Sequence, residues 1–252
     1  MKKLLDQHYF AINAESASGI KEFIKSPAHY RQWQTGEREV TPAMKLGTAV
    51  HTCVLEPDMF AKYYTWTDLD KRTKEFKEFE KKMGSAIILS ESDFKTCRGI
   101  KQSFHSHSKI KPVIDSAFKE MAFQWVHKPT GLALKAKLDM FTEDGWVVDL
   151  KTCQDAIDFK GSMNKYYRVQ SCFYLTALKE AGIKPKKFSF AAVEKTAPYA
   201  MKLYRPSQRA LDQAAFEIEQ ALERIAQCKA SGIYPGYNDD EEEVDLRPWE
   251  AI

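Results

Sequence analysis

Hydrophobic and polar residues alternate along two neighbouring segments near the middle of the chain. In residues 132–139 the apolar side chains occupy the even positions, while two lysines and Asp139 occupy odd positions. Successive strand residues point to opposite faces of a sheet, so this pattern predicts a half-buried β-strand. The turn-forming residues 142–145 follow, and a second strand-like run extends from Trp146 to Lys151. The two segments together predict a β-hairpin.

The predicted hairpin brings two carboxylates together. Folding it about the turn places Asp139 opposite Asp149, to within about one residue of register, where facing Cβ atoms are about 4.5–5.5 Å apart. Two negative charges at that distance are unfavourable unless a cation lies between them or one carboxylate is protonated. Carboxylate oxygens suit the hard cations Mg²⁺ and Mn²⁺. We therefore predict a divalent-metal site, with Lys151 on the same face as Asp149 to orient or activate the attacking water in phosphodiester hydrolysis.

A helical pattern precedes the hairpin. Residues 41–57 begin with Thr41-Pro42, a cap followed by proline at the first helical position, and end at Pro57. Gly47 and His51 lie on one face of this predicted helix. The glycine costs about 1 kcal/mol of helix propensity relative to alanine, and it leaves room beside the histidine. A lone histidine among apolar neighbours is more often a packed core residue than a ligand, and spacing alone leaves both alternatives open.

A second helical pattern follows the hairpin. Residues 163–181 predict a helix that ends at Gly182, and it carries Tyr167, Gln170 and Tyr174 on one stripe. That stripe could face a nucleotide. On spacing alone, the favoured alternative is a helix that packs two tyrosines against the sheet, with the glutamine hydrogen-bonded to the backbone.

An acidic residue opens another alternating run upstream of the hairpin. Glu120 begins the strand-like segment 120–126, although a lone glutamate at the start of a strand is usually solvated. An isolated Asp-x-Lys tripeptide is likewise most often the solvated edge of an ordinary sheet. The functional signal is therefore the constellation of these residues, because each of them alone has an ordinary structural explanation.

The features follow one another in the order and approximate spacing of a known family. They are Gly47-(x)3-His51, Glu120, Asp139, Asp149-Leu150-Lys151-Thr152 and Gln170-(x)3-Tyr174. With these motifs the chain resembles the PD-(D/E)XK nucleases, and within them the RecE-type exodeoxyribonuclease VIII group of phage and prophage recombination exonucleases, relatives of lambda exonuclease. The ends of the chain are also similar to that group, at residues 16–21, 26–30, 234–237 and 246–249.

The resemblance implies a restriction-endonuclease-like α/β core, in which helices flank a central mixed β-sheet. It implies a two-ion site for Mg²⁺, for which Mn²⁺ would substitute. The implied metal ligands are His51, Asp139, Asp149 and the backbone carbonyl of Leu150. The residues implied in catalysis are Lys151, Glu120, Gln170 and Tyr174.

Each of the four catalytic residues has its own implied role. Lys151 would be the catalytic lysine, and Glu120 would serve the second metal or its waters. Gln170 and Tyr174 would lie beside the scissile phosphate. Many members of the family have glutamate where this chain has Asp149, and the shorter side chain would change the distance to the metal without changing the chemistry.

Composition agrees with one compact domain over residues 1–252. With 44% hydrophobic residues the chain can bury a large core, and no Gly/Ser-rich linker divides it. The charge is unevenly distributed. The predicted acidic tail, residues 238–252, holds seven acidic residues and one arginine, a net −6, so the remainder carries +9. A basic body of this kind suits a partner with a phosphate backbone.

The sequence also predicts the cellular compartment in which the protein is found. The N-terminus lacks the apolar stretch of a signal peptide, and no run approaches the roughly 20 apolar residues that cross a bilayer. Five widely spaced cysteines argue for reduced thiols. We therefore expect a cytoplasmic protein with no membrane partner, in a bacterial or phage-infected cell.

The function predicted from these features is a metal-dependent exonuclease that acts on double-stranded DNA ends. Its 5′ to 3′ polarity, a single-strand annealing recombinase as partner and a ring-shaped homo-oligomer are implied by the resemblance alone. Two alternatives stay open. One is a DNA endonuclease or nickase with the same site, and the other is a non-catalytic DNA-binding scaffold subunit in which the acids are structural.

Overall fold

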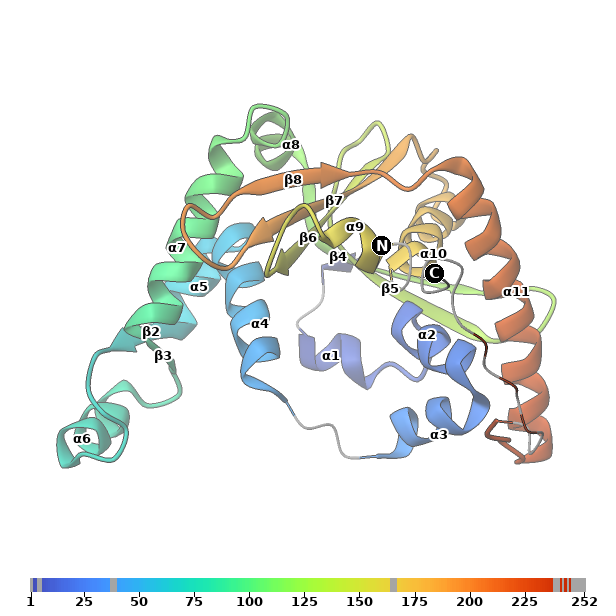
Figure 1. The fold of residues 1–252 in the computed structure, drawn as a ribbon, viewed down its shortest axis with the longest axis horizontal. Coiled ribbons are helices and arrows are strands. Elements are labelled where there is room, and N and C mark those ends of the chain that lie inside the picture. Colours follow the sequence, from blue (N-terminus) through green and yellow to red (C-terminus); the bar gives the residue numbers. More distant parts are fainter. Residues whose placement is uncertain are drawn as a thin grey trace.

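A computed structural model describes residues 2–3, 6–36, 40–163, 167–237, 241, 243 and 245. Its centre is a six-stranded sheet, whose strands in spatial order are β1 (Lys2–Lys3), β4 (Phe118–Val126), β5 (Ala133–Phe141), β6 (Trp146–Cys153), β7 (Lys187–Glu194) and β8 (Met201–Tyr204) (Figure 1). The β6 and β7 strands are parallel and the other neighbours are antiparallel. The sheet is therefore mixed, as predicted.

Helices cover both faces of this sheet, and each face has its own hydrophobic core. The helices α2 (Ala17–Lys25), α3 (Pro27–Thr35), α10 (Arg168–Glu180) and α11 (Gln208–Ser231) bury apolar residues against one face. The helices α4 (Pro42–Leu55), α5 (Pro57–Tyr63), α7 (Glu91–Ser106) and α8 (Lys111–Ser116) do so against the other. Neighbouring strand residues such as Val147 and Val148 belong to different cores, because their side chains point to opposite faces. The predicted α/β fold is confirmed.

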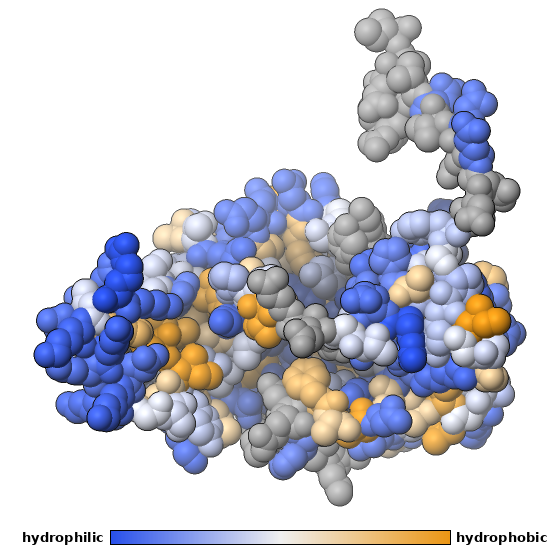
Figure 2. Space-filling view, turned by 90° about the horizontal axis from the view of Figure 1, so that it is seen from below, coloured by the Kyte–Doolittle hydropathy of each residue, from blue (hydrophilic) through white to orange (hydrophobic). Residues whose placement is uncertain are grey.

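A limb extends from the second helical layer. It contains the parallel strands β2 (Tyr64–Thr67) and β3 (Ile87–Ser90), and the helix α6 (Lys74–Met83) lies at its far end (Figure 1). Figure 2 shows that this end of the molecule is strongly hydrophilic, in keeping with the lysines and glutamates of α6. Two short helices complete the elements, α1 (Asp6–Ala11) and α9 (Phe159–Ser162).

The predicted hairpin and the first predicted helix are both present. Strands β5 and β6 are antiparallel with Met140 opposite Val148, and the turn between them has Gly145 at a φ of +83°. The helix α4 begins after Thr41, whose hydroxyl accepts a hydrogen bond from the backbone N–H of Met44 at 3.2 Å. That contact is the expected N-cap, since it satisfies a donor that the first helical turn leaves free.

One predicted boundary was wrong. The strand that was expected to begin at Glu120 begins at Phe118, and Glu120 lies inside it with a φ of +54°. This left-handed residue breaks the alternation, so the pattern before it did not resemble a strand. The helix expected over residues 163–181 includes α10, from Arg168 to Glu180. Met163 and Tyr167 also have helical backbone angles, and residues 164–166, between them, lie outside the described residues.

Some of the segments singled out in the sequence lie outside the described residues. Most of the acidic tail, including residues 246–249, is among them. Within the part of the chain that is described, none of the helices is both long enough and apolar enough to span a bilayer.

Candidate active site

The β5–β6 hairpin carries the two central carboxylates of the site. Asp139 on β5 accepts a hydrogen bond through Oδ2 from the backbone N–H of Leu150 on β6, at 2.7 Å. A side chain thus links the two strands at this point, whereas backbone pairing joins them nearer the turn. Leu150 contributes through its backbone, because its side chain is fully buried in the core on the α4 side.

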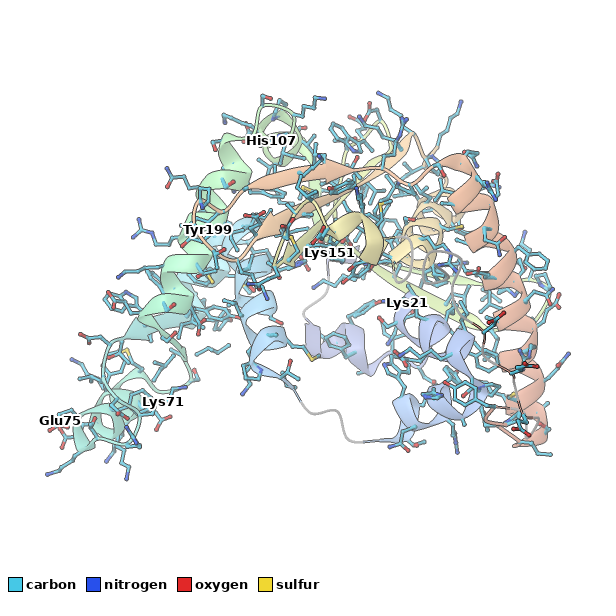
Figure 3. The ribbon with its side chains drawn as sticks, viewed as in Figure 1. Lys21, Lys71, Glu75, His107, Lys151 and Tyr199 are labelled. Atoms are coloured by element: carbon cyan, nitrogen blue, oxygen red, sulfur yellow. The ribbon has the colours of Figure 1, made fainter. Side chains whose placement is uncertain are left out.

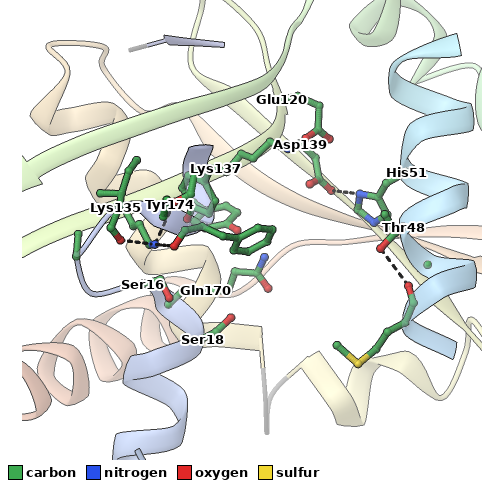
Figure 4. A pocket seen from close by; sticks show the side chains of 18 of the residues that line it. Ser16, Ser18, Thr48, His51, Glu120, Lys135, Lys137, Asp139, Gln170 and Tyr174 are labelled. Carbon is green, nitrogen blue, oxygen red and sulfur yellow. Dashed lines mark hydrogen bonds and ion pairs between the residues drawn. The ribbon is translucent and has the colours of Figure 1, made fainter. Parts of the chain in front are cut away.

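His51 reaches Asp139 from the helical layer on that side of the sheet. Its Nδ1 lies 3.5 Å from Asp139 Oδ2, and Figure 4 shows the two side chains pointing toward each other from α4 and β5. Gly47, one turn earlier on α4, also lines the cleft, and apart from its chain neighbours and the adjacent backbone of α4, no atom lies within 4 Å of where a Cβ at this position would sit. The room predicted beside His51 is present.

Three side chains form a group with the geometry of a metal site. One ligand atom each from His51, Glu120 and Asp139 lies within 4.8 Å of the others. Glu120 comes from β4, the neighbour of β5, and its carboxylate also pairs with the Lys137 ammonium. One imidazole nitrogen and two carboxylate oxygens are donors that a divalent cation such as Mg²⁺ or Mn²⁺ accepts. The residues present therefore fit a divalent ion.

Asp149 belongs to a second, adjoining group. Its carboxylate is completely buried, and Gln170 on α10 donates a hydrogen bond from Nε2 to Oδ1 at 2.8 Å. Oδ2 lies against the Lys151 ammonium as an ion pair, and it accepts no hydrogen bond of good geometry from the described residues. Asp149 thus stands outside the group formed by His51, Glu120 and Asp139. A buried oxygen held by charge alone retains lone pairs for a further cation.

Burial raises the pKa of two of the carboxyl groups. For Glu120 it raises the pKa to about 7, with a further increase from the charge of Asp139 that Lys137 offsets in part. For Asp149 burial raises the pKa to about 6, against the opposing effect of Lys151. Desolvation disfavours a charged carboxylate, so both groups are less acidic than usual.

The pKa values of Asp139, His51 and Lys151 all shift in the direction that favours the charged form of each side chain. Burial also acts to raise the pKa of Asp139, but His51, Lys151 and the Leu150 N–H outweigh it, and the pKa falls below its usual value. Burial lowers the pKa of His51, and the Asp139 carboxylate raises it by more. Burial lowers the pKa of Lys151 as well, yet the neighbouring Asp149 and Asp139 carboxylates shift it upward overall. The surroundings of Asp139 therefore favour its ionised form.

A cleft of about 920 Å³ opens onto this arrangement. Its wall includes His51, Glu120, Asp139, Gln170 and Tyr174. Asp149 and Lys151 lie behind that wall, and Figure 3 shows Lys151 in the middle of the molecule. The chain thus brings every residue predicted for the site to one cleft or directly behind it.

Comparison with known proteins assigns the chain to a family. Residues 16–245 match the family described as "PDDEXK-like domain of unknown function (DUF3799)". The chain belongs to this family. The match covers most of the chain and includes all of the site residues named above.

Solved structures resemble this PDDEXK-like domain in fold. The structure named "Putative exonuclease" from Eubacterium rectale has 17% sequence identity and a TM-score of 0.70, and the match covers 98% of this chain and 96% of that one. A phage related exonuclease from Haemophilus somnus 129PT has 12% identity and a TM-score of 0.41, covering 90% and 100%. The first shows a shared fold, and the second is too distant to add an argument. Comparison with curated proteins gives no significant match.

Two lysines of this PDDEXK-like domain were missed in the sequence. Lys137 pairs with Glu120, at the edge of the group that Glu120 forms with His51 and Asp139. Lys135 is buried, and its ammonium donates to the carbonyl oxygens of Tyr9, Phe10 and Ile12 at 3.1, 3.4 and 2.8 Å. It therefore holds the end of α1 on the cleft wall. Both lysines stood on the polar parity of the predicted strand, where solvated lysines are ordinary, so no local signal distinguished them.

Proposed function

We propose that this protein is a metal-dependent nuclease that hydrolyses phosphodiester bonds of double-stranded DNA from its ends. The observation that carries the proposal is the group of His51, Glu120 and Asp139 in an open cleft, with the buried pair of Asp149 and Lys151 directly behind it. Donor atoms for a divalent ion beside a lysine are suited to reactions at phosphorus, in which negative charge must be stabilised.

His51, Glu120 and Asp139 would hold a divalent ion, Mg²⁺ with Mn²⁺ as a substitute. Asp149 and the carbonyl of Leu150 are further donors for it or for a second ion. When bound, such an ion supplies a Lewis acid for the phosphate and its nucleophile. The distances that join Glu120 to His51 and Asp139 support its proposed role as a ligand.

The remaining residues would position the reacting groups. Lys151, paired with Asp149, would orient the attacking water and offset the charge that develops on the phosphate. Gln170 holds Asp149 through Oδ1, which fixes the carboxylate in one orientation. Tyr174 lines the cleft one turn further along α10, where it would contact the substrate.

The finer assignment rests on the family resemblance of the motifs. It comprises membership of the RecE-type group, 5′ to 3′ polarity, a ring-shaped homo-oligomer and delivery of single-stranded DNA to an annealing recombinase in the cytoplasm. The name of the Eubacterium rectale structure is in keeping with an exonuclease. We also propose that residues 1–252 form one domain.

The test is digestion of linear duplex DNA labelled at the 5′ or the 3′ end, with and without Mg²⁺, beside a covalently closed circle. Wild type is compared with Asp149→Ala and Lys151→Ala. We expect Mg²⁺-dependent release of the 5′ label first, loss of that release in both variants, and an intact circle. Cleavage of the circle would indicate an endonuclease. Absence of metal-dependent cleavage on every substrate would indicate a DNA-binding scaffold.

A further inference from the structure

A second lysine lies close to Lys151 and takes no part in the function proposed above. Lys21 is on α2, one turn after Ser18, which lines the cleft. Its Nζ is 5.5 Å from the centroid of the Tyr167 ring, and the Nζ of Lys151 is 5.2 Å from the same centroid. Figure 3 shows both lysines in the middle of the molecule, one from α2 and one from β6. Two cations therefore share one aromatic ring.

Of the two lysines beside Tyr167, only Lys151 has a carboxylate as an ion-pair partner among the described residues. Lys151 has Asp149 as its ion-pair partner, whereas Lys21 forms no ion pair with a carboxylate among the described residues. The nearest acid on its own helix, Glu22, pairs with Lys25 at 2.7 Å. Burial and the repulsion of Lys151 lower the pKa of Lys21. A partly buried cation beside another cation is costly unless an anion comes between them.

We propose that Lys21 binds a phosphate of the DNA strand that the site cleaves, and that Lys21 and Lys151 together form a two-lysine phosphate site over Tyr167. This inference rests on the proposed function and assigns α2 a part in holding the substrate. An ammonium is a compact donor that suits a phosphate oxygen. The negative charge of the phosphate would offset the positive charge of Lys21, which has no carboxylate partner among the described residues. The phosphate is either an internal phosphodiester or the terminal phosphate of the strand, which offer the same oxygens.

The chain contains a matched control on the same helix. Lys25 lies one turn beyond Lys21, its side chain is 49% exposed, and its charge is already paired with Glu22. Lys21→Met and Lys25→Met remove the same charge from the same helix. Lys21→Arg keeps the charge, so it separates the loss of a cation from a change in packing on Tyr167.

The experiment measures both cleavage and binding of short duplexes. One set carries a single neutral methylphosphonate at each of the first linkages from the cleaved end, and another carries either a terminal phosphate or a hydroxyl. Cleavage gives kcat/KM with Mg²⁺, and fluorescence anisotropy gives the dissociation constant as a function of salt. Thermal unfolding checks that each variant is folded.

We expect Lys21→Met to weaken binding and kcat/KM about tenfold or more, as for loss of one charge-assisted hydrogen bond. Its salt slope should fall by about one. Wild type should lose a similar factor when one particular phosphate is neutral, and Lys21→Met should lose nothing further there. That position identifies an internal or a terminal phosphate. Lys25→Met should match wild type, and Lys21→Arg should recover most of the loss.

Three results would overturn the inference. If wild type cleaves and Lys21→Met behaves as Lys25→Met does, Lys21 binds no phosphate although the nuclease function stands. The loss of binding caused by Lys21→Met and the loss caused by each neutral linkage could also prove additive at every position. That result would likewise mean that Lys21 contacts none of these phosphates. If wild type neither binds nor cleaves these duplexes, both proposals fail. Binding without cleavage, still weakened by Lys21→Met, would support the phosphate site and contradict the nuclease.

Discussion

Asp139 and Asp149 lie on neighbouring strands of one hairpin, but their surroundings differ. The Asp139 side chain is 14% exposed at the cleft, and His51 and the Leu150 N–H stabilise its negative charge. The Asp149 side chain is completely buried, and burial raises its pKa to about 6 even with Lys151 beside it. Two acids of the same motif thus differ because Asp139 lines the cleft and Asp149 is buried beneath Gln170.

The site accordingly has two parts. The Asp139 part, with His51 and Glu120, is open to the cleft and has the donors for a cation. The Asp149 part centres on a completely buried carboxylate, which contacts with Lys151 and Gln170 hold in place. We infer that the first part recruits the ion, and that the second becomes fully satisfied only when ion and substrate are present.

The largest effect should be on cleavage, and it should be common to both parts. Asp139→Asn and Asp149→Asn each remove a charge that the reaction needs, so we expect kcat to fall by at least about 10²–10³-fold in each. Initial rates on end-labelled linear duplex with Mg²⁺ measure this. A variant that keeps more than a tenth of the wild-type rate would exclude its acid from the active site.

The next largest effect should be on stability, where the asparagine variants of Asp139 and Asp149 should change the free energy of unfolding in opposite directions. Without metal at pH 8, Asp149→Asn should stabilise the protein by up to about 3 kcal/mol, since a raised pKa means that the fold favours the neutral form. Asp139→Asn should destabilise it, since the fold favours that carboxylate ionised. Urea unfolding in EDTA measures both. Asp144→Asn, in the exposed hairpin turn, is the control and should change little. Shifts of the same sign in both site variants would contradict the division into two parts.

The pH dependence of the thermal stability of the metal-free protein should reflect the raised pKa values of Glu120 and Asp149. Folding favours the neutral forms of Glu120 and Asp149, and these forms add to the free energy of unfolding. That added stability is fully present below about pH 4, and it is lost as pH rises through about 6 for Asp149 and about 7 for Glu120. We expect Tm in EDTA to fall between pH 5 and 8. Mg²⁺ should raise Tm more at pH 8 than at pH 5, because ionised carboxylates bind it.

A variant at Glu120 tests that explanation. Glu120→Gln should flatten the part of the curve near pH 7 and weaken the stabilisation by Mg²⁺. Thermal unfolding of both proteins across the pH series is the measurement. An unchanged curve in the variant would mean that other groups cause the pH dependence.

The smallest effect should come from the glycine beside His51. A Cβ at Gly47 would meet no atom within 4 Å beyond its chain neighbours and the adjacent backbone of α4, so Gly47→Ala should stabilise α4 by about 1 kcal/mol. It should also slow cleavage, because the added methyl group narrows the cleft next to the metal ligands. Gly161→Ala is a matched control, with open surroundings and no place in the cleft wall. A stabilised Gly47→Ala with full activity would mean that the substrate does not use this space.

Much of the site could be predicted because its elements are specified locally. Alternation predicts the β5–β6 hairpin, and the cap at Thr41 with Pro42 predicts the start of α4. The spacing of Gln170 and Tyr174 places both on one helix, which the structure contains as α10. The local signal failed at Glu120, where a left-handed φ breaks the alternation of the strand.

The order and type of the central elements, and the positions of the candidate site residues within them, could therefore be predicted from short-range patterns and family motifs. Their grouping was not. Glu120 joins His51 and Asp139 while Asp149 stands apart with Lys151, and Lys21 meets Lys151 over Tyr167. Caps and periodicity depend on residues within a turn or two of the chain. The burial and charge of a carboxylate depend on side chains that distant segments bring to it when the layers pack.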